Sequence, residues 1–333
     1  MKFPDDCFNC GVGRIARQDV REHFMTSKAA VFVVVLNLLL TAPTIADATS
    51  YSVDTIAEGL LAAEAQFTDL RLDYVFTHRA WNKPKGPRLV VKAVYAQKMS
   101  KNTPKRLRYL DRKHSIVDPN TKKVTLGQET LASFDGQATI ILYRKDESGK
   151  QMNPMKGYIL AGYKHNHFPT LYMGPHTKIW YYHKKLLLGD FLKKFRQGFR
   201  IESESESLDG ISTVKLVGTW ADPYNGVKFT MKLWVATERN FLPLKRQIMR
   251  ADGEMLTETA LYDLVQLPNG MWYPKTIRSP ADPPGIQKPR LAHIYNISKI
   301  SIDPIPKDFF RPEFPPNTRV LDDILKVTYT TTD

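Results

Sequence analysis

Apolar and polar residues alternate with a period of two along most of the chain, and this pattern predicts strands. In residues 227–235, Phe229, Met231 and Leu233 share one face with two valines, while lysines, a threonine and a tryptophan occupy the other. Asp252-Gly253 and Asn269-Gly270 stand between such runs, and these dipeptides favour tight hairpins. The pattern predicts an antiparallel meander, with further strands at 70–76, 88–99, 106–110, 122–126, 138–143, 244–250, 255–265 and 271–277.

Two segments repeat their apolar residues with the period of a helix. The first is 53–66, which follows a capping serine, Ser52. The second is 184–197, whose apolar side is formed by Leu187, Leu188, Phe191, Leu192 and Phe195. Lysines and an arginine cover its other side. This second helix therefore either packs on the sheet with its lysines in water, or lies on an anionic membrane surface.

The N-terminal region has the pattern of an export signal. Met25 and one lysine precede an apolar run at 29–40, and small residues follow at Ala46-Asp47-Ala48. The run is shorter than the roughly 20 apolar residues that a membrane-spanning helix needs. We expect Met25 to be the true start, cleavage after Ala48 and a periplasmic domain at 49–333. The alternative is an uncleaved signal that anchors the protein in the inner membrane.

Charge and cysteine content narrow the classes of partner. The chain carries 48 Lys and Arg against 34 Asp and Glu, a net charge of +14. Residues 1–48 contain five of each sign, so the excess remains after cleavage. This positive charge either favours anionic partners such as phospholipid head groups or serves solubility alone. Nucleic acid is a disfavoured partner because we expect the protein to be exported. Cys7 and Cys10 both precede the cleavage site, so the exported domain depends on an apolar core rather than on disulfides.

Candidate catalytic and metal sites are few. Histidines gather in the aromatic-rich segment 158–183, but no acidic residue lies between Lys150 and Leu188 to orient a metal site. The sequence has no G-x-S-x-G and no H-E-x-x-H motif. Alternating glutamates and serines at 202–207 are typical of a solvated strand edge. We therefore expect no cofactor, no metal and no enzyme. The histidines concerned are His165, His167, His176 and His183.

Three segments carry a resemblance to a known family. They are the strand and turn at 233–246, the hairpin at 262–274 that ends in Met-Trp-Tyr-Pro, and the tail at 302–322 with its Phe-Phe-Arg-Pro. Together with the helix before the first strand, they resemble the exported LolA/LolB-like lipoprotein-sorting proteins. The resemblance implies a mainly β fold with α-helices. In it, a strongly curved antiparallel sheet forms an unclosed β-barrel, and amphipathic helices cover its concave apolar face.

The resemblance also implies a carrier that holds the acyl chains of lipoproteins without chemistry, and we expect this protein to be a monomer. The cavity wall and lid that we expect are formed by Phe229, Met231 and Leu233, and by Leu188, Phe191 and Phe195. The alternative for each residue is an ordinary filled core. Two other functional classes remain open at this point. One is an envelope sensor or regulatory module on the same fold, and the other is a hydrolase.

Overall fold

The computed structural model describes residues 50–80, 86, 88–99, 106–164, 178–181, 184–223, 225–280 and 291–332. These residues belong to one compact unit that begins at Ser50. The predicted signal at 1–48 and the four histidines of the aromatic-rich segment lie outside the described residues. Within the described part of the chain, no helix is both long and apolar enough to cross a bilayer.

Strands dominate the described residues, which confirms the mainly β prediction. Fifteen strands form one sheet, and a separate hairpin pairs β7 (Lys178–Tyr181) with β8 (Lys184–Leu187). The strands of the sheet, in chain order, are β1 (Asp69–Ala80), β2 (Arg88–Lys98), β3 (Leu107–Val117), β4 (Val124–Phe134), β5 (Ala138–Lys145), β6 (Gln151–Ala161), β9 (Phe199–Leu208), β10 (Ile211–Ala221), β11 (Lys228–Ala236), β12 (Leu242–Arg250), β13 (Met255–Gln266), β14 (Trp272–Pro280), β15 (Leu291–Ser301), β16 (Thr318–Asp322) and β17 (Val327–Thr330).

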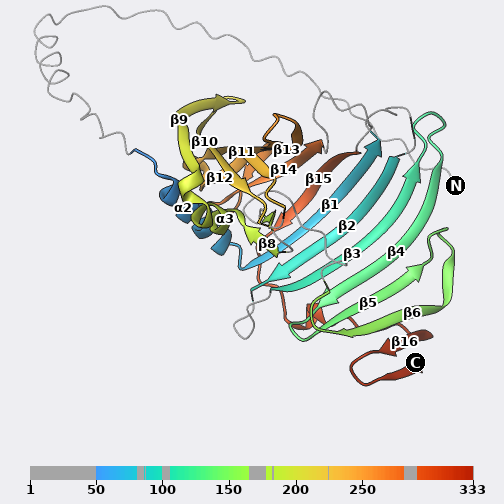
Figure 1. Ribbon diagram of the computed structural model, residues 1–333. Coiled ribbons are helices and arrows are strands. Elements are labelled where there is room, and N and C mark those ends of the chain that lie inside the picture. The colour runs from blue at the N-terminus through green and yellow to red at the C-terminus, as the bar shows by residue number, and fades with distance from the viewer. Residues whose placement is uncertain are drawn as a thin grey trace, which may run out of the picture. The chain divides into compact units, whose positions relative to one another are not determined.

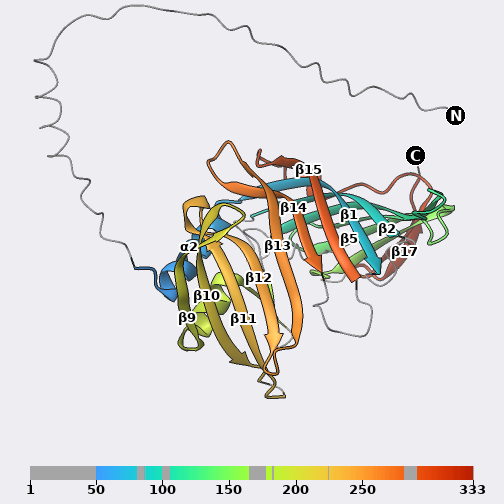
Figure 2. The same cartoon turned by 90° about the horizontal axis from the view of Figure 1, so that it is seen from above.

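The sheet consists of two meanders joined in the middle. Its order is β17-β16-β6-β5-β4-β3-β2-β1-β15-β14-β13-β12-β11-β10-β9, which Figures 1 and 2 show from two sides. All neighbours are antiparallel except β16, which runs parallel to β6. The predicted hairpins at Gly253 and Gly270 are present, and both glycines have positive φ, at 87° and 80°. The central pair of β1 with β15 joins the first strand of the sequence to the last long one.

The predicted strong curvature is wrong. The sheet is not closed, as expected, but it is also not strongly curled (Figure 2). Strong curvature needs bulges or glycine bends repeated at a corner of the sheet. Here the register shifts are scattered over several strand pairs, among them β1/β15, β4/β5 and β11/β12. The ordinary strand twist is therefore spread along a wide sheet.

The first predicted helix is present and the second is shorter than predicted. Helix α2 spans Val53–Ala65, and the Thr55 N–H donates to Ser52 Oγ at 3.0 Å. The segment predicted as one helix at 184–197 begins as strand β8 and becomes helical only in α3 (Leu188–Lys194). Pairing with β7 holds the first four residues extended, because their backbone groups bond across the hairpin. A 3₁₀ turn, η2 (Arg196–Gly198), follows the helix.

The strand registers define one continuous face, here called the inner face. Phe76 pairs with Tyr295, Tyr295 with Ile277, and Ile277 with Leu261. Through β12 the same face continues to Leu233 in β11. Because side chains alternate along a strand, paired residues share a face. The inner face carries the two largest apolar clusters, and both helices lie at its β9–β12 end (Figures 1 and 2).

Candidate functional site

The six residues predicted as cavity wall and lid all belong to one apolar cluster. Met231, Leu233 and Phe191 are fully buried, and Leu188 is 3% exposed. Phe229 and Phe195 are partly buried at its border. The sequence pattern thus placed these residues together correctly, because both the strand face and the helix face are amphipathic. Their role in ligand binding remains a prediction. We call α2, α3 and the inner face of β9–β12 the helix-covered half.

Aromatic rings hold α3 against the sheet. The ring of Phe191 lies 5.0 Å from that of Trp220 and 4.8 Å from that of Phe195, between centroids. Trp220 in turn stacks on Phe229 at 5.4 Å, and Phe199 packs edge-on against Phe191 at 6.1 Å. Edge-to-face ring pairs add to the stability that burial alone supplies. Sequence reasoning missed Trp220 and Phe199, although alternation along 211–221 could have placed Trp220 on the inner face.

Two glycines permit this close packing. A Cβ on Gly218 of β10 would stand 2.2 Å from the ring of Phe199, so only glycine leaves room for that ring on the sheet. A Cβ on Gly189 of α3 would stand 2.6 Å from the Ala57 carbonyl oxygen of α2. The two helices therefore approach each other at backbone distance. This contact ties α3 to α2 as well as to the sheet.

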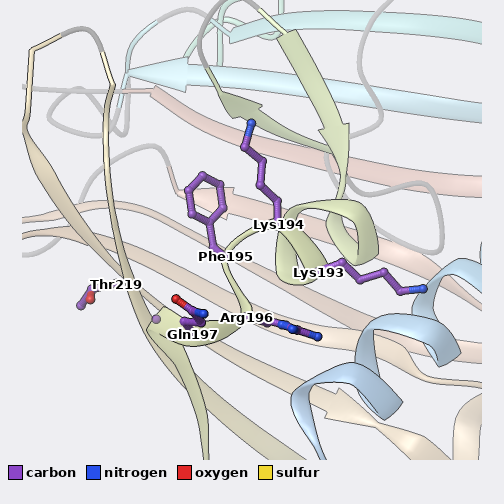
Figure 3. A pocket seen from close by; sticks show the side chains of 7 residues that line it. Lys193, Lys194, Phe195, Arg196, Gln197 and Thr219 are labelled. Carbon is purple, nitrogen blue, oxygen red and sulfur yellow. The ribbon is translucent and has the colours of Figure 1, made fainter.

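A basic depression of about 350 Å³ borders the cluster at the C-terminal end of α3. In Figure 3, Lys193 and Arg196 extend toward α2, whereas Lys194 and Phe195 extend away from it. Lys193 Nζ lies 3.5 Å from Glu58 and Arg196 Nη1 3.6 Å from Asp54 of α2. Cations at a helix C-terminus are favoured by the helix dipole. The depression is lined by Lys193, Lys194, Phe195, Arg196, Gln197, Gly198 and Thr219.

The inner face of β1–β6 differs from the helix-covered half, and we call it the tyrosine half. Tyr74 and Tyr95 are buried there, and burial raises the pKa of the Tyr74 phenol above its ordinary value. Large residues around them remain only partly buried, namely Phe76, Leu89, Tyr143, Tyr158 and Leu160. Sequence analysis placed none of these residues in a site. It predicted strands at 70–76 and 88–99 without assigning them a role, and β3–β6 come from a region with weaker alternation.

Two histidines face each other at one end of this half. His78 pairs across the strands with His293, and their ring centroids are 4.9 Å apart. Burial lowers the pKa of His78, and burial together with the nearby His78 lowers the pKa of His293. Among the described residues, no group of three His, Cys, Asp or Glu is arranged to hold a metal ion. The pair therefore does not extend into a described metal site.

Comparisons with known proteins give a structural likeness only. No protein-family model matches the sequence, and no curated protein is similar to it in sequence. The chain is similar in structure to a domain from Vibrio parahaemolyticus named for outer membrane lipoprotein sorting, with 13% identity and a TM-score of 0.42 over 78% of this chain and 96% of that one. It is also similar to a LolA-superfamily protein from Nitrosomonas europaea, with 12% identity and a TM-score of 0.39 over 78% and 98%.

A third solved structure has no functional name. It is a DUF1329 family protein from Desulfovibrio piger, with 13% identity and a TM-score of 0.42 over 78% of this chain and 98% of that one. The resemblance to LolA-like proteins that the sequence indicated is thus found again as a structural similarity.

Proposed function

We propose that this protein binds an acylated or otherwise apolar ligand and carries it without chemistry. The observation that supports this is the division of one continuous inner face. In its helix-covered half the central apolar residues Met231, Leu233 and Phe191 are fully buried, and only residues at the border of the cluster are partly exposed. In its tyrosine half, large apolar residues of the same face remain partly exposed. Removing an acyl chain from water is worth about 0.8 kcal/mol per CH₂, so such a surface binds one favourably.

The residues of the helix-covered half have a supporting role in this proposal. In this proposal Phe229, Met231 and Leu233 form the wall. The lid, which α3 holds against it, is formed by Leu188, Phe191 and Phe195. Phe195 connects the cluster to the basic depression, since it contributes to both. Lys193 and Lys194 would face an anionic membrane surface while the ligand is exchanged. Helix α3 has only seven residues, so displacing it breaks few backbone hydrogen bonds.

Export belongs to the same proposal. A periplasmic carrier requires the predicted cleavage after Ala48 and a mature domain at 49–333. N-terminal sequencing of the protein from the periplasmic fraction should give Thr49 as the first residue. Recovery of an uncleaved chain from the inner-membrane fraction would favour the anchored alternative instead.

Lipid extraction and mass spectrometry of natively purified protein provide the direct test of binding. We expect a copurified lipid or acylated species in stoichiometric amount. A fluorescent fatty-acyl probe should then bind saturably, and Leu89→Gln in the tyrosine half should weaken it. Val90→Gln is the matched control, because Val90 is the next residue of β2, is also partly buried and points to the opposite face. If no acyl probe binds saturably to the wild type, the sensor hypothesis replaces the carrier.

A further inference from the structure

Charges on strands β1–β6 are divided between the two faces of the sheet. All four carboxylates of these strands lie on the outer face, opposite the tyrosine half. Each has a basic partner there, so none of these four carboxylates is left without an ion pair. The pairs are Lys98–Asp69 at 2.9 Å, Arg71–Asp73 at 3.7 Å, Arg144–Asp111 at 2.9 Å and Lys145–Glu129 at 2.6 Å.

The inner face of the same strands carries Arg108, Arg112 and Lys156 but none of the carboxylates of these strands. Arg112 stands in the middle of a row that runs across five strands, formed by Tyr74, Ala93, Arg112, Thr130 and Tyr143. Its Nε donates to Thr130 Oγ1 at 2.8 Å. Burial lowers the pKa of its guanidinium, although Tyr143 and Tyr74 favour the charged form. Among the described residues, no carboxylate forms an ion pair with Arg112.

Two other polar atoms of the inner face have no hydrogen-bond partner within the described part of the chain. His114 follows Arg112 on the same face of β3, and its Nε2 is buried without a hydrogen bond. The hydroxyl of Tyr273 in β14 is likewise buried without a hydrogen bond. Buried polar atoms without partners are costly and uncommon. The internal segments that lie outside the described residues contain a single acidic residue, Asp282.

We propose that the tyrosine half binds the negatively charged head group of a lipid, with Arg112 as its main cationic contact and His114 beside it. The acyl chain then lies on the apolar residues of the same face. This inference rests on the proposed function and specifies its ligand class. A guanidinium forms paired hydrogen bonds with a carboxylate or phosphate, and such bonds strengthen where water is excluded. A neutral apolar ligand that covered the half-buried Arg112 would bury this cation further without a compensating anion.

The test compares a fluorescent fatty acid with its primary amide, which has the same chain and no charge. In the wild-type protein, the acid should bind about tenfold to a hundredfold more tightly than the amide, the range for a hydrogen bond to a charged group. Arg112→Met should reduce this preference to about threefold or less, because it weakens binding of the acid much more than binding of the amide. Arg144→Met is the control, because Arg144 is a similarly half-buried arginine on the outer face.

Several outcomes separate this inference from the function on which it rests. If neither probe binds to the wild type, the carrier function fails. If both bind equally well, or Arg112→Met keeps the preference for the acid, only the head-group assignment is overturned. If Arg112→Met does not fold, Arg112→Lys tests the head-group assignment instead. It keeps the charge but loses the paired geometry, so the preference should fall several-fold. If inorganic phosphate binds as tightly as the fatty acid, the lipid assignment is overturned in favour of a free anion.

Discussion

The two halves of the inner face differ in how completely their large apolar side chains are removed from water. In the helix-covered half, a helix on the sheet removes Met231 and Phe191 entirely from water. In the tyrosine half, amphipathic side chains such as Tyr143 and Arg112 remain half-buried beside apolar ones. A filled aromatic cluster contributes mainly to stability, whereas a partly exposed mixed surface retains unsatisfied binding capacity. The comparison indicates that substitutions in the first half should mainly affect folding, and those in the second mainly ligand binding.

The largest effect is expected from Phe191→Ala in the helix-covered half. Its ring is fully buried and contacts Phe195, Phe199 and Trp220. Its loss should reduce the free energy of unfolding by about 3–5 kcal/mol, as for other buried phenylalanines. Urea denaturation measures this, and a loosened lid should also speed probe release in stopped-flow. Phe76→Ala in the tyrosine half is the comparison and should cost clearly less. Equal losses would contradict the division into two halves.

Met231→Trp tests whether the helix-covered half contains unfilled space. The side chain of Met231 is fully buried among the other residues of its cluster. The larger tryptophan ring must therefore displace some of these neighbours. We expect overpacking to lower the free energy of unfolding by about 1–3 kcal/mol and acyl-probe binding to weaken. Thermal and urea unfolding give the first value and probe titration the second. A variant as stable as the wild type would reveal a cavity within the cluster.

Lys193 and Lys194 connect the helix-covered half to a membrane in the proposed function. Replacing both by Gln should weaken binding to anionic vesicles by about 1 kcal/mol per lysine at low salt, and the effect should shrink at high salt because of screening. Vesicle cosedimentation measures this. Lys228→Gln together with Lys232→Gln, on the outer face of β11, provides the control with the same loss of charge. An equal effect of both pairs would indicate a general charge effect.

The smallest effect concerns pH and the His78–His293 pair. The pKa of each is lowered in the folded state, so the neutral forms stabilise the fold above about pH 6.5, the ordinary value. That contribution is lost as the pH falls from this value through the lowered pKa values. The wild type should therefore be slightly less stable at pH 5.5 than at pH 7.5, and His293→Phe should reduce the difference. Urea titrations at both pH values measure it. If His293→Phe lost as much stability between pH 7.5 and pH 5.5 as the wild type, other titratable groups would be responsible for the loss.

Local chemistry made several elements predictable from the sequence. Ser52 and the apolar spacing after it determined α2, and Asp252-Gly253 and Asn269-Gly270 determined two hairpins, because these signals act within a few residues. The alternation in 227–235 also identified the buried face of β11, where Met231 and Leu233 lie. The candidate residues of the helix-covered half followed from the same amphipathic periods. The resemblance to LolA-like proteins added the idea of an acyl-chain carrier.

Only the tertiary structure decided the features that depend on long-range pairing. Residues 184–187 are extended because a β-hairpin partner competes with helical periodicity. The sheet remains without strong curl because bulges and registers, rather than strand patterns, set its curvature. Arg112 gains its importance only because pairing places it among Tyr74, Thr130 and Tyr143, with the carboxylates on the opposite face. A sequence period identifies which residues share a face of one strand, but the register between distant strands determines which charges meet across the sheet.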